Sequence, residues 1–297
     1  MNIAKFASYA DFESASRAVL AFLHQRLGFE LWMVTRTEGD NWIVLQAEDH
    51  GYGVKDGDVF HWADSFCSQM VQGLGPCIAP KSDLIPAYAA APIGKQVNIG
   101  AYVGVPIADS DGSLFGTLCA IDPMTKSESL HQELPLLELL GGMLSCLLVS
   151  DRKLLTNQRR YERNLSNITT DPETGLMNRA GWENVIEAEE KRCRIYGHSA
   201  CVVLIRLNEW QLDSKQSSEF SKALRACLGP SDLLARIEPN LFGVIGAERN
   251  AEQGNALLDL VKIALLPICT DSQFTLANRD PRTGLKFAIE QSKQLVF

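Results

Sequence analysis

The stretch GAYVGVPIADSDGSLFGTLCAIDP, residues 100–123, decides the fold of the first half of the chain. It holds two apolar segments, AYVGVPIA and SLFGTLCAI, on either side of DSDG. Asp111-Gly112 is a strong signal for a tight hairpin turn, because glycine adopts a positive φ at no steric cost. The pattern therefore predicts two antiparallel strands, over residues 101–108 and 113–121.

The segments around this hairpin extend the pattern of helices and strands. Residues 11–27 place apolar side chains at helical spacing before Gly28, a natural helix stop. LWMVTRT and NWIVLQAE, joined by EGDN, are typical of a second strand pair. DSFCSQMV, residues 64–71, predicts a short helix with Asp64 as its N-cap. A second long helix begins at Leu134.

This order of elements resembles a GAF domain over most of residues 5–150. The resemblance rests on FHWADSFCSQMVQGLGPCIAP and on the opening hairpin, which is similar to the signature of GAF domains that precede GGDEF domains in bacterial signalling proteins. It implies a six-stranded antiparallel sheet flanked by helices, with a small-molecule pocket on one face. We therefore assign residues 1–150 to a GAF sensor domain of the α+β class.

The irregular segment before the hairpin supplies most candidate ligand contacts for this pocket. Its mixture of aromatic and polar side chains suits a small organic ligand. The candidates are Trp62, Asp64, Ser65, Cys67, Met70, Asp83, Tyr88, Tyr102 and Cys119. Plain packing is an alternative interpretation for Trp62 and Tyr102, and helix capping is one for Asp64.

The eight cysteines form no CxxC pair and have no zinc-finger spacing with histidine. In a reducing cytosol most of them are expected to be buried thiols. Cys67 lies near the start of a predicted helix, which lowers a thiol pKa, so a redox role with Cys119 or Cys77 is a second interpretation. No second ligand is suggested for His61, and we predict neither a metal nor a cofactor.

The helix after the hairpin carries a heptad pattern. Apolar side chains recur every seven residues at Leu140, Leu147, Leu154, Tyr161 and Ile168. Leu144 and Leu165 fill companion positions, whereas Asp151 and Gln158 interrupt them. This imperfect coiled-coil seam predicts a parallel dimer stalk over residues 151–170. A single solvated helix packed on its own domain is the alternative.

The remainder, residues 171–297, resembles a GGDEF domain of α/β fold. The family's entry motif, roughly D-x-L-T-G-L-x-N-R, is matched by DPETGLMNR at residues 171–179, with Glu173 in place of the usual Leu. An apolar strand ACVVLIRL, a helix SSEFSKALRACLG and a hairpin ARIEPNLFGVI follow. The resemblance implies synthesis of cyclic di-GMP from two GTP molecules, with metal ions held on carboxylates.

The residues that this chemistry needs are replaced. Where the resemblance implies metal-binding acids and a Gly-Gly-Asp-Glu turn, the chain has Arg206, Asn208, Glu238, Pro239, Asn240 and Leu241. At contact distance and an effective dielectric near 20, an arginine repels a divalent metal by roughly 8 kcal/mol. The guanine-reading loop is shortened, and the R-x-x-D inhibitory motif keeps Asp232 but has Gly229 for arginine. The scaffold residues Leu176 and Phe242 persist, so we predict no catalytic residues and a degenerate domain.

Charge and hydropathy bound the remaining possibilities. A net charge of −8 disfavours nucleic acid and anionic membranes as partners. The N-terminus lacks the apolar core of a signal peptide, and the apolar stretch at residues 134–149 is short and broken. The sequence thus predicts a cytoplasmic homodimeric sensor that binds a small molecule and relays its state to a GGDEF or phosphodiesterase protein. The alternatives are a diguanylate cyclase with an atypical or heterodimeric site, and an effector whose GAF domain binds a nucleotide.

Overall fold

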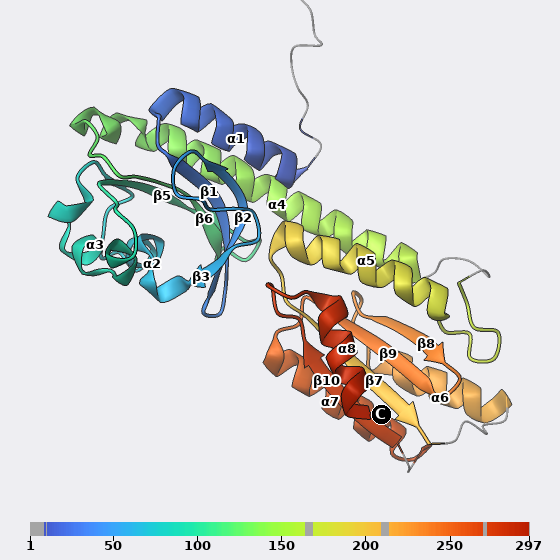
Figure 1. Cartoon of the computed structure of the whole chain (residues 1–297). Helices are drawn as coiled ribbons and strands as arrows, with labels where there is room; N and C mark the ends of the chain where they lie inside the picture. The colour runs from blue at the N-terminus through green and yellow to red at the C-terminus, as the bar shows by residue number, and fades with distance from the viewer. Residues whose placement is uncertain (1–8, 10, 164–168, 209–213, 270–271, 297) are drawn as a thin grey trace, which may run out of the picture. The chain divides into compact units, whose positions relative to one another are not determined.

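The computed structural model describes residue 9 and residues 11–163, 169–208, 214–269 and 272–296 (Figure 1). The chain divides into two compact units, Met1–Lys153 and Leu154–Phe297. This boundary falls inside the segment expected to be a stalk, and the three-part division at residues 150 and 170 stays a prediction.

The first unit is built on a six-stranded sheet in the order β3-β2-β1-β6-β5-β4. All its strand pairs are antiparallel, which confirms the expected architecture. The strands are β1 (Leu31–Glu38), β2 (Asn41–Asp49), β3 (Val59–His61), β4 (Ile78–Ala79), β5 (Ala101–Ala108) and β6 (Leu114–Asp122). The hairpin that opened the sequence analysis is β5–β6, and Gly112 in its turn has a φ of +80°.

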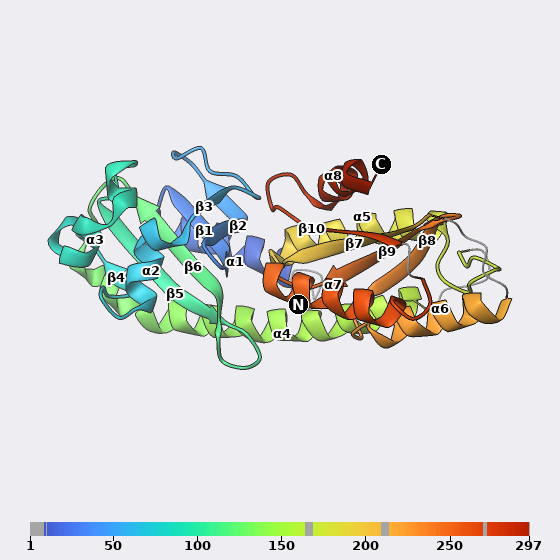
Figure 2. The same ribbon diagram turned by 90° about the horizontal axis from the view of Figure 1, so that it is seen from below.

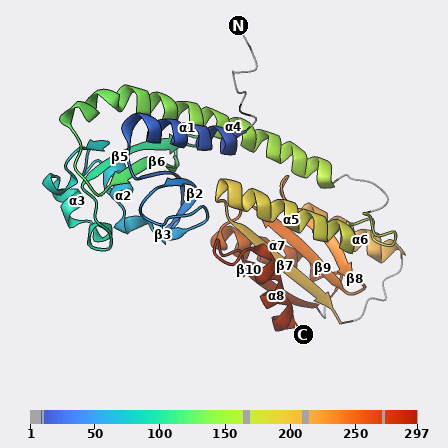
Figure 3. The ribbon, with the colours of Figure 1, turned by 45° about the horizontal axis from the view of Figure 1, so that its top comes forward.

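Helices cover both faces of this sheet. On one face, α1 (Phe12–Leu27) lies alongside the first half of α4 (Leu134–Arg163), as Figure 3 shows. The opposite face carries the short helices α2 (Phe66–Val71) and α3 (Pro86–Ala90). The predicted first helix is confirmed, with Asp11 as its N-cap and Gly28 as its left-handed C-cap.

The long helix α4 is tied to the first unit by specific contacts. The Ser145 hydroxyl accepts a hydrogen bond from the Ala108 N–H at 3.0 Å. Asp151, predicted to interrupt a dimer seam, instead accepts a hydrogen bond from the Phe12 N–H at the start of α1, at 2.7 Å. By length and composition alone, the helical segment of residues 128–162 also qualifies as a candidate membrane span, a criterion that core helices of soluble proteins meet as well.

The last turns of α4 have one buried face and one exposed face. Leu155 and Arg159 are buried, whereas Leu154 is 57% and Tyr161 is 68% exposed. The exposed pair belongs to the predicted heptad, whose earlier members Leu140 and Leu147 are half-buried and whose companion Leu144 is buried. The heptad's last member, Ile168, and its companion Leu165 lie outside the described residues.

The second unit has a four-stranded antiparallel sheet in the order β10-β7-β9-β8. Its elements are α5 (Arg179–Tyr196), β7 (Ala200–Leu207), α6 (Ser214–Ala226), β8 (Leu233–Glu238), β9 (Leu241–Ala247), α7 (Ala251–Leu265), β10 (Ser272–Asn278) and α8 (Leu285–Val296). Figure 2 shows this sheet between α5 and α8 on one side and α6 and α7 on the other.

Strand β7 explains this layering. Val202 and Leu204 pack into the core shared with α5 and α8, while Val203 and Ile205 pack into the core shared with α6 and α7. Successive side chains of a strand point to opposite faces, so an unbroken apolar run is buried on both. The expectation of a strand buried on both faces is confirmed.

Candidate functional site

The first unit contains a cavity of about 240 Å³ between the sheet and the segments around α2. Alternate residues of β1 and β6 form its floor, because side chains two apart share one face of a sheet. The cavity is lined by Leu31, Met33, Trp42, Tyr52, Gly53, Val54, Asp58, Phe60, Phe66, Cys67, Ile93, Gln96, Val97, Ile99, Tyr102, Cys119 and Ile121.

Three of the nine candidate ligand residues meet at this cavity. Cys67 comes from α2, Tyr102 from β5 and Cys119 from β6, and all three side chains are almost fully buried. The Tyr102 hydroxyl donates a hydrogen bond to the Cys67 sulfur at 3.4 Å. The cavity therefore brings together only part of the predicted group of ligand residues. These lie around the thiol of Cys67 and not around Trp62.

The other candidates have structural roles or lie at the surface. Ser65, not Asp64, is the N-cap of α2, and its hydroxyl accepts from the Ser68 N–H at 3.0 Å. The prediction of Asp64 as the cap was thus wrong by one residue, because a short 3-10 turn precedes the helix. Asp64 instead pairs with His61 at 3.2 Å, and Asp83 is exposed.

The aromatic candidates outside the cavity are packing residues. Trp62 is half-buried and lies 6.4 Å from Trp42, measured between ring centroids. Tyr88 stacks on Phe66 with centroids 4.7 Å apart, and its hydroxyl donates to the Pro76 carbonyl. Met70 is buried in the same apolar core. Sequence reasoning missed the cavity walls from β1 and β2, although side chains two residues apart in the strand LWMVT share one face of the sheet.

The cavity carries little charge. Asp58 is the single charged residue among the described residues that line it. Its carboxylate already accepts a hydrogen bond from the Lys55 N–H at 2.9 Å. Anionic groups such as phosphates are bound by cationic side chains and N–H donors. The lining therefore favours an uncharged, largely apolar ligand.

The second candidate region is the tip of the β8–β9 hairpin, beside the end of β7. Pro239 and Asn240 form the turn, as predicted, and Leu241 is fully buried. The Leu207 N–H donates to the Asn240 carbonyl at 2.9 Å, which fastens the tip to β7. The Arg206 guanidinium lies 3.8 Å from the Glu238 carboxylate, while Asn208 is exposed.

A second arginine neutralises the acids of the entry motif. Arg236 lies 3.2 Å from Asp171 and 2.5 Å from Glu173, and it also donates to the Pro239 carbonyl. Partial burial opposes ionisation of Asp171, but hydrogen bonds from Thr174 and the charge of Arg236 hold its pKa below the ordinary value. Glu173, which stands in place of the usual leucine, thus gives Arg236 an ion-pair partner.

Other residues that match the GGDEF family's motifs have structural roles in this chain. Asn178 caps α5 by accepting from the Gly181 N–H at 3.0 Å, and Gly175 has a φ of +64°. The buried Asp232 is held by Arg249 through two hydrogen bonds of 3.0 and 2.6 Å. The residues present at the hairpin tip, with Arg206 facing Glu238 and Leu241 in the core, do not fit a divalent metal ion.

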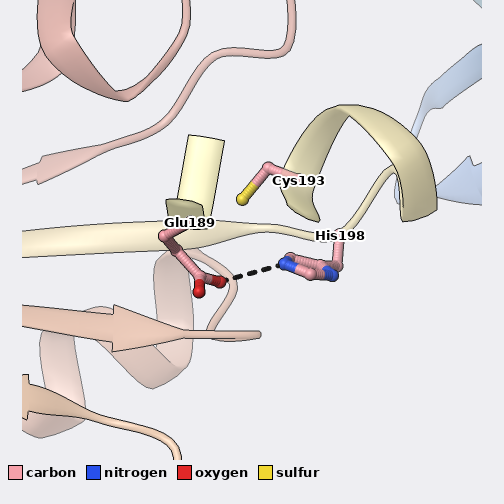
Figure 4. Close-up of side chains that lie close together, drawn as sticks. All are labelled: Glu189, Cys193 and His198. Atoms are coloured by element: carbon pink, nitrogen blue, oxygen red, sulfur yellow. Dashed lines mark hydrogen bonds and ion pairs between the residues drawn. The ribbon is translucent and has the colours of Figure 1, made fainter. Parts of the chain in front are cut away.

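A third polar cluster lies buried in the second unit, and Figure 4 shows its Glu189, Cys193 and His198. Their potential ligand atoms lie within 4.8 Å of one another. Arg159 donates to both Glu189 oxygens, at 3.0 and 2.8 Å, and Arg192 donates to one at 3.0 Å. Burial, reinforced by the charge of Glu189, raises the pKa of Cys193 far above its ordinary value. Glu189 is already paired with two arginines, and the thiol of Cys193 is protonated. The cluster is therefore an ion-pair centre and does not suit a metal ion.

Comparison with known proteins gives one family match. Residues 11–147 match the family model described as the GAF domain. No curated protein matches the chain.

Three solved structures illustrate the partial likenesses. The GGDEF domain of DgcB from Caulobacter crescentus, in complex with c-di-GMP, is 13% identical over 44% of this chain and 86% of that chain, with a TM-score of 0.39. The FimX GGDEF domain from Pseudomonas aeruginosa is 17% identical over 44% and 91%, with a TM-score of 0.38. Free methionine-R-sulfoxide reductase from Neisseria meningitidis, in complex with its substrate, is 15% identical over 50% and 83%, with a TM-score of 0.41.

The family assignment of the first unit rests on the sequence match and on its own topology. The matched region, residues 11–147, contains all of α1, the complete six-stranded sheet and the start of α4. The chain therefore contains a GAF domain over residues 11–147.

Proposed function

We propose that this chain is a cytoplasmic signalling protein that belongs to a cyclic di-GMP circuit. Its GAF domain senses a small molecule in the apolar cavity. Its second unit is a GGDEF-like domain that makes no cyclic di-GMP and relays the sensor's state by contact with another GGDEF protein or a phosphodiesterase. The chain works as a homodimer joined along the exposed side of α4.

The arginines at the hairpin tip are the observation that carries this proposal. Arg206, which stands where the resemblance expects the first metal-binding acid, lies 3.8 Å from Glu238. Arg236, two residues before the turn, is paired with Asp171 and Glu173 of the entry motif. Each fixed positive charge repels a cation and occupies a carboxylate that could bind one. Without metal ions, the charge that develops in phosphoryl transfer has no counterion.

Titration of the whole chain with GTP in the presence of Mg²⁺ or Mn²⁺ tests the inactive site. We expect no binding heat at micromolar GTP, while an active GGDEF protein titrated in the same buffer gives a saturable curve. A saturable, metal-dependent curve for this chain would contradict the proposal and favour a cyclase with an unorthodox site.

Native mass spectrometry of the purified chain, before and after denaturation, tests the sensor. We expect a dimer that releases a small, uncharged, apolar molecule. The apolar lining argues against a cyclic nucleotide in this cavity, so titration with cyclic mono- and dinucleotides should give no heat. A co-purified nucleotide would instead support the effector alternative.

A further inference from the structure

The cavity of the GAF domain contains a thiol pair whose chemistry goes beyond ligand binding. Cys67 and Cys119 both line the cavity, and both are 1% exposed, so the cavity gives access to two otherwise buried sulfurs. The thiols come from different elements, α2 and β6, and the Cys67 sulfur lies 3.4 Å from the hydroxyl of Thr117, which is two residues before Cys119 on the same face of β6. A pair of adjacent thiols on an open cavity is an arrangement in which one sulfur can react and the other can resolve the product.

Two hydrogen-bond donors converge on one of these sulfurs. The Tyr102 hydroxyl and the Thr117 hydroxyl each lie 3.4 Å from the Cys67 sulfur. Burial raises a thiol pKa, but interaction with the Cys119 thiol and these hydrogen bonds outweigh burial and lower the pKa of Cys67 below its ordinary value. The thiolate is the nucleophilic form of cysteine, so Cys67 is the reactive member of the pair.

The partner thiol has the opposite character. Interaction with Cys67, followed by burial, raises the pKa of Cys119 well above its ordinary value. Burial, followed by the charge of Cys67, likewise raises the pKa of Tyr102. Both groups therefore keep their protons, and Tyr102 stays a donor to the Cys67 sulfur. This asymmetry distinguishes an attacking sulfur from a resolving one.

The cavity also selects the reagent. Its walls are aliphatic and aromatic, and Asp58 is the single charge among its described lining residues. Charged oxidants and charged disulfides such as glutathione disulfide are disfavoured by such a lining. An uncharged reagent with an apolar group gains free energy on entry, because its apolar surface leaves water.

We propose that Cys67 and Cys119 form a redox site that reacts with uncharged organic hydroperoxides. The Cys67 sulfur attacks the terminal oxygen of the hydroperoxide, so that an S–O bond forms, the O–O bond breaks, and an alcohol leaves with the proton that Cys67 gave up. The Cys119 sulfur then attacks the sulfenic sulfur, so that the S–S bond forms, the S–O bond breaks, and water leaves with the proton of Cys119. Two thiols lose two electrons in total, and the hydroperoxide accepts them.

Peptide mapping of the oxidised whole chain tests the site without any variant. The reduced protein is treated with cumene hydroperoxide or with hydrogen peroxide at equal concentration, alkylated and digested. We expect a Cys67–Cys119 disulfide, formed about tenfold faster with cumene hydroperoxide because its aromatic group gains apolar burial. Oxidation that spares Cys67, or a disulfide formed no faster with cumene hydroperoxide, would overturn the proposal.

Variants then separate the two roles. Cys119→Ser should stop at a sulfenic acid on Cys67 that reacts with dimedone, whereas Cys67→Ser should leave Cys119 reduced. Cys146→Ser, which removes an exposed thiol outside the cavity, should leave disulfide formation unchanged. Dimedone labelling at Cys119 in the Cys67→Ser variant would show that the assignment of roles is wrong.

Discussion

At the scale of single residues, buried arginines determine the character of the second unit. Arg159 is fully buried and contacts Glu189 and Glu248. Arg236 forms ion pairs with Asp171 and Glu173. Removing one member of a buried ion pair is costly, because the remaining charge stays out of water without a partner. These arginines therefore support the fold, and each is paired with two acidic side chains.

The Arg159→Met substitution should destabilise the chain strongly. Arg159 loses its contacts with both acids, so we expect the free energy of unfolding to fall by about 3–5 kcal/mol. Arg160→Met, at the exposed neighbouring position, is the matched control and should change it by less than about 0.5 kcal/mol. Urea denaturation measures both, and equal effects would mean that the buried cluster does not contribute.

The same cluster predicts a pH dependence. Burial opposes ionisation of Glu189, but hydrogen bonds from His198 and Arg159 hold its pKa far below the ordinary value for glutamate. As the pH falls, Glu189 binds a proton in the unfolded chain before it does so in the folded chain. The contribution of Glu189 to stability is therefore present above pH 4.5 and is lost below it. Unfolding free energies measured between pH 6 and pH 3 should fall less steeply in Glu189→Gln than in wild type. Glu219→Gln, at an exposed site, should keep the wild-type slope.

At the scale of helices and strands, local sequence patterns predicted most of the architecture. The apolar segments AYVGVPIA and SLFGTLCAI, with Asp111-Gly112 between them, predicted β5 and β6, and Asp11 and Gly28 marked the ends of α1. The cavity was harder to predict, because its walls come from strands and loops that are far apart in sequence. The buried role of Arg159 was missed for a related reason: its helix is polar around it, and only the contact with α5 distinguishes it from the exposed Arg160.

The cap between α4 and α1 gives a prediction at this scale. Asp151 accepts a hydrogen bond from the Phe12 N–H, a group that α1 cannot satisfy within itself. Asp151→Ala should therefore lower the free energy of unfolding by about 1–2 kcal/mol. Asp83→Ala, at an exposed position in the same unit, should have almost no effect. Thermal unfolding followed by circular dichroism measures the difference, and matching midpoints would rule out the cap.

At the scale of the whole molecule, we propose that the exposed last turns of the α4 seam join two chains. Leu154 and Tyr161 lie seven residues apart and are both exposed, while the opposite side of the helix is buried. The double substitution Leu154→Glu and Tyr161→Glu should bring like charges together across a dimer. We expect it to raise the dissociation constant of the dimer by at least about tenfold. Lys153→Glu, at an exposed position outside the heptad, is the control for charge alone. Sedimentation equilibrium reports the dissociation constants, and an unchanged dimer in the double variant would place the interface elsewhere.

We propose that the second unit has kept a GGDEF-like scaffold and lost its chemistry. The most direct measurement is cyclic di-GMP production from GTP with Mg²⁺ or Mn²⁺, with an active GGDEF protein as the positive control. The chain should make none, alone or mixed with an inactivated but otherwise intact GGDEF partner, because Arg206 and Asn208 stand at the metal-binding positions and Asn240 and Leu241 replace the acids of the turn. Cyclic di-GMP accumulating in proportion to the concentration of this chain would contradict the account.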